Sequence, residues 1–232
     1  MHFAFLTSAS APWGAETSLK LIAEGLTKQG SAVTVIAASD EVAEFLREGT
    51  TFVTIGTARE RHSRIRRLVR FAVNALRVTS VGDVVVAFSV NLYPLVLLRL
   101  FGRRVVLDIH DSLREPRGRL IVGIFGRLAN RNVEISRYIA GHYGLPRGRV
   151  VGRPVLIPPT SVLSLSGPLR EIGIVGRLDP SKRIETAIAA VACLPGTRLR
   201  IYGEPFEDDG RYLASLKRLA ERAAPGLSLI HI

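Results

Sequence analysis

The chain has 232 residues, of which 47% are hydrophobic, and its formal net charge is +12. This apolar content excludes an intrinsically disordered chain, and the length allows one large or two small domains. The positive charge favours an anionic partner, such as a nucleotide, a phospholipid surface or a nucleic acid. The single cysteine, Cys193, cannot form an internal disulfide, which is typical of a reducing cytoplasm, and we expect it in the core rather than as a nucleophile.

The sequence indicates neither secretion nor a membrane span. Its first residues lack the basic segment of a signal peptide, and their apolar run is short. The most apolar later run, 90–101, contains Arg99 and falls well short of the roughly 20 residues that a spanning helix needs. We therefore expect a cytoplasmic protein.

In chain order, apolar runs of strand length alternate with amphipathic helical patterns. The expected strands are 2–7, 32–37, 51–55, 83–88, 104–109, 133–136, 172–175, 198–202 and 227–232. The expected helices are 17–29, 40–47, 59–77, 91–100, the basic segment 113–131, 182–194 and 208–224. This alternation predicts an α/β fold built on two doubly wound, Rossmann-like parallel sheets.

A passage rich in proline, threonine and serine divides the chain. We expect an N-terminal domain at 1–160, a linker at 161–169 and a second domain at 170–232. The second domain has only three expected strands, and the last of them, 227–232, would be an uncovered apolar edge. We therefore expect this domain to be incomplete, as in a truncated chain.

The stretch 171–194 combines a short strand, a polar turn with Arg177 and Lys182, and an amphipathic helix. Asp179 or Ser181 can cap this helix. Its apolar face is formed by Ile184, Ala187, Ile188 and Val191. Backbone N–H groups, a helix N-terminus and two cations around one point could hold a phosphate or diphosphate. An ordinary strand-to-helix turn with solvated charges has the same pattern.

Other site motifs are missing from the sequence. The first strand-to-helix turn, 8–16, has only Gly14 where a dinucleotide-binding loop needs three glycines. No P-loop, no His/Cys cluster with metal-ligand spacing and no nucleophile elbow occurs, so we expect no metal and no cofactor. Ligands of doubly wound sheets lie at the carboxyl ends of the strands. The turns at Gly14 and at Arg177 and Lys182 are therefore the expected walls of a cleft.

With its elements in this order, the sequence resembles the family 4 retaining glycosyltransferases, which have the two-domain GT-B fold. The matching stretches are 13–16 with the following helix and strand, 105–111, 135–136, 173–182 and 199–203. The resemblance implies a nucleotide-diphosphate sugar as donor. It also implies a saccharide or lipid-linked acceptor, and a place in cell-envelope or polysaccharide biosynthesis.

The resemblance implies roles for particular residues. Arg177 and Lys182 would hold the diphosphate and stabilise the leaving group, and Gly14 and Gly176 would complete the donor site. His110 would lie beside the sugar as the third catalytic residue, although a hydrogen-bonded histidine at a strand end is an equal alternative.

The sequence also departs from the family pattern. The glycine that often follows the family's lysine is Arg183 here, and the usual Asn-Gly before the linker is Arg153 followed by Pro154. A later pair of glutamates that binds sugar and ribose in the family has no counterpart. We therefore expect the isolated chain to be inactive.

The segment 59–77 is rich in arginine, and we name four of its arginines as a membrane or acceptor surface: Arg64, Arg66, Arg67 and Arg70. Its expected apolar face is formed by Ile65, Leu68, Val69, Ala72 and Leu76. A solvated face, an interfacial helix and a nucleic-acid-binding helix all stay open. The interfacial helix would lay Val69, Phe71 and Leu76 on an anionic membrane, peripherally on its inner face. The aromatic content of 6% and the lack of a recognition motif disfavour nucleic acid.

Three functions are compatible with the sequence. The first is a retaining glycosyltransferase, and the second is a non-catalytic fragment or pseudoenzyme that binds nucleotide or membrane. The third, less favoured, is a sugar-nucleotide epimerase with the same architecture.

Overall fold

In the computed structural model, the described residues are 1–56, 64–113, 115–157, 171–194, 196–205 and 210–223. The chain forms two compact units, Met1–Pro158 (unit 1) and Pro159–Ile232 (unit 2), which we describe separately. The expected linker at 161–169 and the expected last strand at 227–232 lie outside the described residues.

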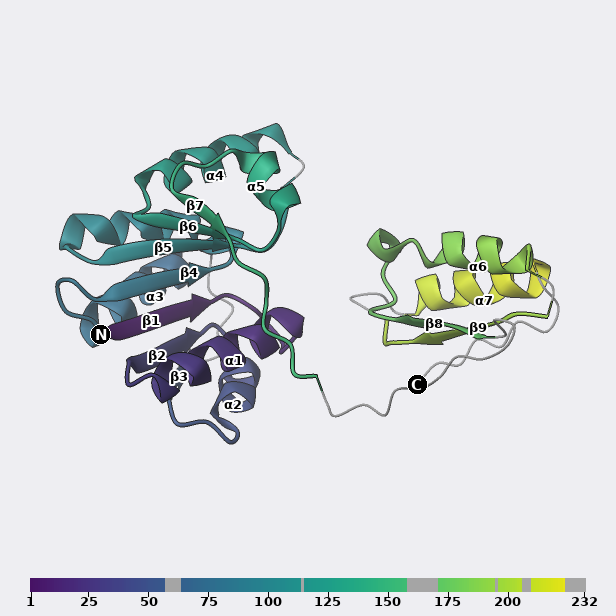
Figure 1. Ribbon diagram of the computed structural model, residues 1–232, viewed down its shortest axis with the longest axis horizontal. Helices are drawn as coiled ribbons and strands as arrows, with labels where there is room; N and C mark the ends of the chain where they lie inside the picture. Colours follow the sequence, from purple (N-terminus) through teal and green to yellow (C-terminus); the bar gives the residue numbers. More distant parts are fainter. Residues whose placement is uncertain (57–63, 114, 158–170, 195, 206–209, 224–232) are drawn as a thin grey trace. The chain divides into compact units, whose positions relative to one another are not determined.

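Unit 1 is built on a seven-stranded parallel sheet with the strand order β3-β2-β1-β4-β5-β6-β7 (Figure 1). The strands are β1 His2–Thr7, β2 Ala32–Ala37, β3 Val53–Gly56, β4 Val84–Phe88, β5 Arg104–Ile109, β6 Arg131–Glu134 and β7 Gly148–Val150. The chain winds in one direction from β1 to β3 and in the other from β4 to β7. The topological switch point, where such sheets bind ligands, therefore lies between β1 and β4.

Helices cover both faces of this sheet. They are α1 Gly14–Lys28, α2 Asp40–Arg47, α3 Arg64–Val78, the 3₁₀ helix η1 Val90–Phe101, α4 Pro116–Leu128 and α5 Arg137–Tyr143. Alternate strand residues point to opposite faces. Leu6 of β1 shares one buried cluster with residues of α3, η1, α4 and α5, whereas Phe5 shares another with residues of α1 and α2. In Figure 1, α1 and α2 lie in front of the strands and α3 lies behind them.

Unit 2 contains a two-stranded parallel sheet, β8 Glu171–Val175 with β9 Arg198–Tyr202, together with η2 Pro180–Lys182, α6 Ile184–Ala192 and α7 Arg211–Ala223. The face of α6 expected to be apolar is buried against β9 and α7, through Ile184, Ile188 and Val191. The prediction of an α/β fold with parallel sheets is confirmed in both units.

The structure corrects several local expectations. Helix α1 begins at Gly14 rather than at residue 17, and α5 and β7 had not been expected. Residues 90–101 form a 3₁₀ helix that contains Pro94. Cys193 is exposed at the end of α6, not in the core, because the buried face of that helix is formed by its neighbours at 184, 188 and 191. Within the described ranges, no helix is long and apolar enough to cross a membrane.

Candidate functional site

The turn after β1 is held by a buried glutamate. Thr7 donates its hydroxyl to Glu16 Oε1 at 3.0 Å, and the backbone N–H of Trp13 donates to Glu16 Oε2 at 3.2 Å. Such a return bond to the residue before a helix is half of a capping box. The two hydrogen bonds of Glu16 explain why α1 begins three residues earlier than expected. They also fix the start of α1 at the switch point.

Gly14 is not required by the packing of this turn. A Cβ atom at Gly14 would meet no other atom within 4 Å, and the same holds for Gly176 in unit 2. Neither glycine has a positive φ angle. The protein itself would therefore accept alanine at both positions, and a role in donor binding stays a prediction for each.

His110 follows β5 and belongs to a cluster at the carboxyl edge of the sheet in unit 1. Arg153 donates from Nη1 to Asp108 Oδ2 at 3.0 Å and from Nη2 to Asp108 Oδ1, which makes a bidentate ion pair. Nη2 also lies 3.1 Å from His110 Nδ1. The guanidinium lies over the Phe88 ring at 5.0 Å, and the Phe88 and His110 rings form a T-shaped pair with their centroids 4.2 Å apart. Three segments of the chain thus converge on one histidine.

These contacts determine the state of the His110 ring. A guanidinium can only donate, so Nδ1 must be the unprotonated acceptor and the ring proton must lie on Nε2. Burial lowers the pKa of His110, and the charge of Arg153 adds to this, while the carboxylates of Asp108 and Asp111 act in the opposite direction. Nε2 is buried and has no hydrogen-bond partner among the described residues; Asp108 Oδ1 is 3.8 Å away. The ring is therefore neutral, with a buried N–H group at Nε2.

A pocket of about 290 Å³ lies beside the switch point. It is lined by Ser8, Arg67, Leu68, Phe71, Asn91 and Leu92. Ser8 follows β1 and Asn91 begins η1 after β4, so the pocket lies where the two directions of winding meet. Arg67 brings one cation of α3 to this pocket, with a hydroxyl and an amide opposite.

The structure separates the arginines of α3 and corrects its expected membrane face. Arg66 and Arg70 are exposed beside Arg67, and the side chain of Arg64 lies outside the described residues. Phe71, expected on the membrane, is only 2% exposed because it packs into the core beneath η1, whereas Val69 is 55% exposed. Of the residues proposed to meet lipid, only Val69 is on the outer surface, since Leu76 also packs against the core.

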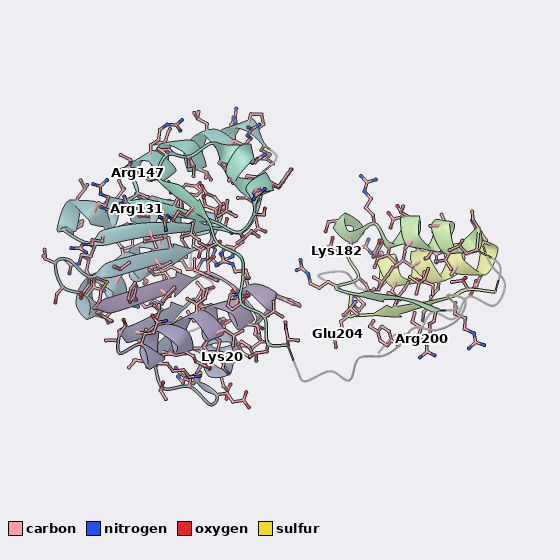
Figure 2. The ribbon with its side chains drawn as sticks, viewed as in Figure 1. Lys20, Arg131, Arg147, Lys182, Arg200 and Glu204 are labelled. Carbon is pink, nitrogen blue, oxygen red and sulfur yellow. The ribbon has the colours of Figure 1, made fainter. Side chains whose placement is uncertain are left out.

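In unit 2 the loops that follow β8 and β9 are joined through their backbones. The N–H of Gly176 donates to Tyr202 O at 2.9 Å, and the N–H of Leu178 donates to Glu204 O at 2.8 Å. A Cβ at Gly203 would lie 1.8 Å from Gly176 O, so only glycine permits this approach. Lys182 and Glu204 lie at the same end of unit 2 in Figure 2.

Arg177 and Lys182 occupy this loop together with Asp179. The Ser181 N–H donates to Asp179 Oδ1 at 2.7 Å, so Asp179 caps the short helix η2 rather than α6. Hydrogen bonds from Ser181 lower the pKa of Asp179, and the positive charges of Arg177 and Lys182 lower it further. Both cations therefore act on one carboxylate, and Lys182 is exposed to solvent.

Arg183 explains one departure from the family pattern. It links η2 to α6 with φ of 51°, in the left-handed region that favours glycine. A glycine at this position would adopt the same backbone conformation without strain.

The candidate residues therefore fall into two groups. Gly14 and His110 lie at the carboxyl edge of the sheet in unit 1, and Gly176, Arg177 and Lys182 lie at that of unit 2. A cleft between the two groups stays a prediction.

The sequence reasoning missed Glu16 as a cap and missed the Asp108–Arg153 pair. A signal for Asp108 was present, because a carboxylate within a buried apolar strand needs a cationic partner. Nothing in the sequence singled out Arg153 as that partner, which lies 45 residues further along the chain.

Neither a protein-family model nor a curated protein matches the sequence. Solved structures do resemble the chain. For the Anabaena protein HepE in complex with UDP, the TM-score is 0.79 at 16% identity, over 100% of this chain and 69% of HepE. For a glycosyltransferase from Rickettsia africae, the TM-score is 0.71 at 12% identity, over 99% of this chain and 68% of that one.

The third similar structure is the apo form of the lipopolysaccharide outer core galactosyltransferase WaaB. Its TM-score is 0.67 at 18% identity, over 100% of this chain and 67% of WaaB. The chain thus spans about two thirds of the length of these proteins. At such identities the likeness shows the fold alone, and that fold is the Rossmann-like α/β fold of the GT-B glycosyltransferases.

Proposed function

We propose that this protein is a retaining glycosyltransferase that moves a sugar from a nucleotide-diphosphate donor to an acceptor. The observation that carries the proposal is the pair of cations, Arg177 and Lys182, around Asp179 at the carboxyl edge of unit 2. A diphosphate needs such a pair, and carboxyl edges of parallel sheets are where nucleotides bind. The likeness to HepE, which was solved with UDP, supports the same choice of donor.

In this proposal the two cations stabilise the departing diphosphate without a metal ion. Negative charge grows on the leaving group as the bond to the sugar breaks, so cations held in place beforehand favour the transition state over the bound donor. Gly176 would leave space for the phosphates, and the N–H groups of the loop would add donors. No group of the protein is assigned as a nucleophile, and the acceptor hydroxyl would attack the face that the diphosphate leaves.

His110 would lie beside the sugar as a neutral ring that Arg153 holds in place. A neutral ring suits a neutral sugar, whereas a buried cation would need a counter-charge. Gly14 would let the first loop approach the same ligand.

The pocket at the switch point is the proposed acceptor site. A serine hydroxyl, an asparagine amide and the guanidinium of Arg67 could bind a hydroxyl-rich or anionic acceptor, and Leu68 and Leu92 add an apolar floor. A saccharide or a lipid-linked saccharide has this mixed character. Such acceptors belong to the assembly of cell-envelope or surface polysaccharides.

Nucleotide binding tests the donor site directly on a chain extended to the length of HepE. Amide chemical shifts from ¹⁵N-labelled protein would be followed while UDP, GDP or ADP is added. We expect changes centred on 176–183, and we expect Arg177→Ala or Lys182→Ala to weaken binding about tenfold, since each charge-assisted bond contributes about 1.5 kcal/mol or more. Lys217→Ala, which removes one exposed cation from α7, is the matched control.

The donor site would be wrong if none of the three nucleotides shifted these amides. It would also be wrong if Lys217→Ala weakened binding as much as Lys182→Ala.

Product analysis separates the transferase from its alternatives. A transferase releases nucleoside diphosphate and glycosylates an acceptor, an epimerase returns an isomerised donor, and a non-catalytic protein binds without turnover. We propose that a chain extended to the length of HepE transfers sugar and that the 232-residue chain alone does not. Robust transfer by the shorter chain would overturn the second part of this statement and support the first.

A further inference from the structure

Strand β6 carries two buried polar side chains on one face of the sheet. Asn132 is 1% exposed and Glu134 is 2% exposed, and alternate residues of a strand point the same way. Asn132 donates from Nδ2 to Gly126 O at 2.9 Å and to Pro146 O at 2.8 Å, which determines the direction of its amide. Its Oδ1 atom is buried and accepts no hydrogen bond from the described residues, and the same holds for Glu134 Oε2. This face of β6 therefore has two acceptors that need a donor.

The carboxyl group of Glu134 is folded back toward Asn132. In the register of β6 with β7, Asn132 pairs with Gly148 and Glu134 pairs with Val150. The carboxyl nevertheless lies over Gly148, because a Cβ atom there would be only 2.7 Å from Glu134 Oε2 and would collide with Oε1 as well. Only glycine leaves room for this approach. The two unpartnered acceptors thus lie in the same row of the sheet, on the same face.

One proton would satisfy both acceptors. An ionised carboxylate can only accept hydrogen bonds, whereas a protonated carboxyl group has one O–H donor. Both N–H groups of the Asn132 amide are already used, so the donor for Oδ1 must come from Glu134. With a proton on Oε2, Glu134 would donate to Asn132 Oδ1, and neither buried atom would carry the cost of a missing hydrogen bond.

The titratable groups of the elements around Glu134 offer no counter-charge. Two of them stand in register with Val133 and therefore point to the other face, Asp108 and Arg149. Four others donate to backbone carbonyls, namely Arg127, His142, Tyr143 and Arg147. The remaining ones are exposed: Arg104, Arg117, Arg119, Arg131, Arg137 and Tyr138. Burial raises the pKa of Glu134, and a hydrogen bond from its own backbone N–H acts in the opposite direction.

Strand β7 connects this carboxyl group to the support of His110. It is the last strand of the sheet, and β6 is its neighbour. The N–H of Val151 donates to Glu134 O at 2.9 Å, and Arg153, two residues further on, contacts His110 Nδ1. A negative charge beside Gly148 would weaken the attachment of β7 and so displace Arg153.

We propose that Glu134 is a neutral carboxylic acid in the folded protein and donates a hydrogen bond to Asn132 Oδ1. In this form it attaches β7 to the sheet and positions Arg153 against His110. Loss of the proton as the pH rises loosens β7. Glu134 is thus a positioning residue whose state depends on pH, and the proposal does not rest on sugar transfer.

Thermal unfolding of Glu134→Gln at a series of pH values tests the neutral state, because glutamine keeps the shape and a donor but cannot ionise. In the unfolded chain a glutamate ionises near pH 4.3, whereas the folded protein resists this ionisation. Stability is therefore lost as the pH rises through the folded pKa. At pH 8 we expect the variant to melt at a higher temperature than the wild type, and we expect the difference to shrink toward acid pH. The matched control is Glu44→Gln, which changes an exposed glutamate of α2 and should show no such trend.

The contact with Gly148 has its own test. Gly148→Ala should lower the melting temperature by roughly 3 to 6 °C, because the added Cβ collides with the carboxyl group. In a Glu134→Ala background the same change should cost much less. Equal losses in the two backgrounds would place the carboxyl group elsewhere and overturn the proposal.

NMR titration tests the positioning role. Arg153 Nε is buried, so its proton can be followed while the ¹³C signal of the Glu134 carboxyl is titrated. We expect the Arg153 signal to shift at the pH where Glu134 ionises, and we expect this transition to be absent in Glu134→Gln. An unchanged transition in the variant would overturn the positioning role. A Glu134→Gln variant that is less stable than the wild type at pH 8, or does not fold, would show that the folded protein needs the ionised carboxylate, and would overturn the neutral state.

Discussion

The carboxyl edges of the two units hold their charges in different ways. In unit 1, Arg153 and Asp108 form a bidentate ion pair, with Asp108 only 4% exposed, and the pair fixes His110. In unit 2, Lys182 is exposed and Asp179 is the carboxylate that it shares with Arg177. At the first edge the positive charge of Arg153 is paired with a buried carboxylate. At the second edge the positive charge of Lys182 is exposed to solvent. A charge that the protein neutralises should matter mainly for stability, and a charge left at the surface mainly for a ligand.

The largest expected effect comes from breaking the pair in unit 1. Arg153→Ala leaves the carboxylate of Asp108 buried without its partner, which typically costs about 3 to 5 kcal/mol. Lys182→Ala should change the free energy of unfolding by less than about 0.5 kcal/mol, because it removes an exposed side chain. Urea denaturation of the two variants, followed by circular dichroism, measures both values.

A second variant distinguishes the lost pair from lost packing. Adding Asp108→Leu to Arg153→Met replaces both charges by apolar groups and should recover most of the stability. If Arg153→Ala and Lys182→Ala cost the same, the contrast between the two edges is wrong.

A smaller effect is expected from the two arginines with left-handed backbones, one in each unit. Arg183→Gly relieves the strain at φ of 51° and should stabilise unit 2 by about 0.5 to 1 kcal/mol. Arg147 has φ of 57°, but its guanidinium donates to Arg127 O at 2.6 Å, so Arg147→Gly also loses a hydrogen bond. At residue 147 we expect the gain from relieving the backbone strain to be nearly cancelled by the loss of this hydrogen bond.

Thermal unfolding of both glycine variants measures this difference. A gain in melting temperature at residue 147 that equals the gain at residue 183 would contradict it, since the side chain of Arg147 would then contribute nothing.

Much of the fold could be predicted from the sequence because its signals are local. The alternation of apolar runs with amphipathic patterns located most of the described strands and helices, and α2 was predicted at its observed bounds, 40–47. The positions of His110, Arg177 and Lys182 after their strands followed from the same reading. Errors arose where a long-range contact determines which side of a helix is buried. Periodicity alone could not distinguish the packing of Phe71 against η1 from contact with lipid.

The support of His110 could not be predicted, since it depends on non-local contacts. Arg153 follows a strand, β7, of only three residues, which had no recognisable pattern. Its side chain reaches Asp108 only because β5, β6 and β7 are neighbours in the sheet. Sequence identified the histidine as a candidate, and tertiary structure determined its tautomer.

The smallest expected effect concerns the pH dependence of stability, and it isolates His110. Burial lowers the pKa of His110 in the folded protein, whereas in the unfolded chain a histidine titrates near 6.5. As the pH falls through about 6.5, the unfolded chain takes up a proton that the folded ring resists, so stability is lost toward acid. The contribution of the neutral His110 ring to stability is fully present above that pH.

Comparison of the wild type with His110→Gln removes the contributions of other titrating groups. Between roughly pH 5 and 7.5 the wild type should lose more stability than the variant, because only the wild type has a buried ring that resists the proton. The charged groups facing His110 are Asp108, Arg153 and Asp111, and Asp111 is exposed. Asp111→Asn should therefore lower the pKa of His110 further, as an NMR titration would show. Parallel losses in the wild type and His110→Gln would mean that the ring is not held neutral by this edge.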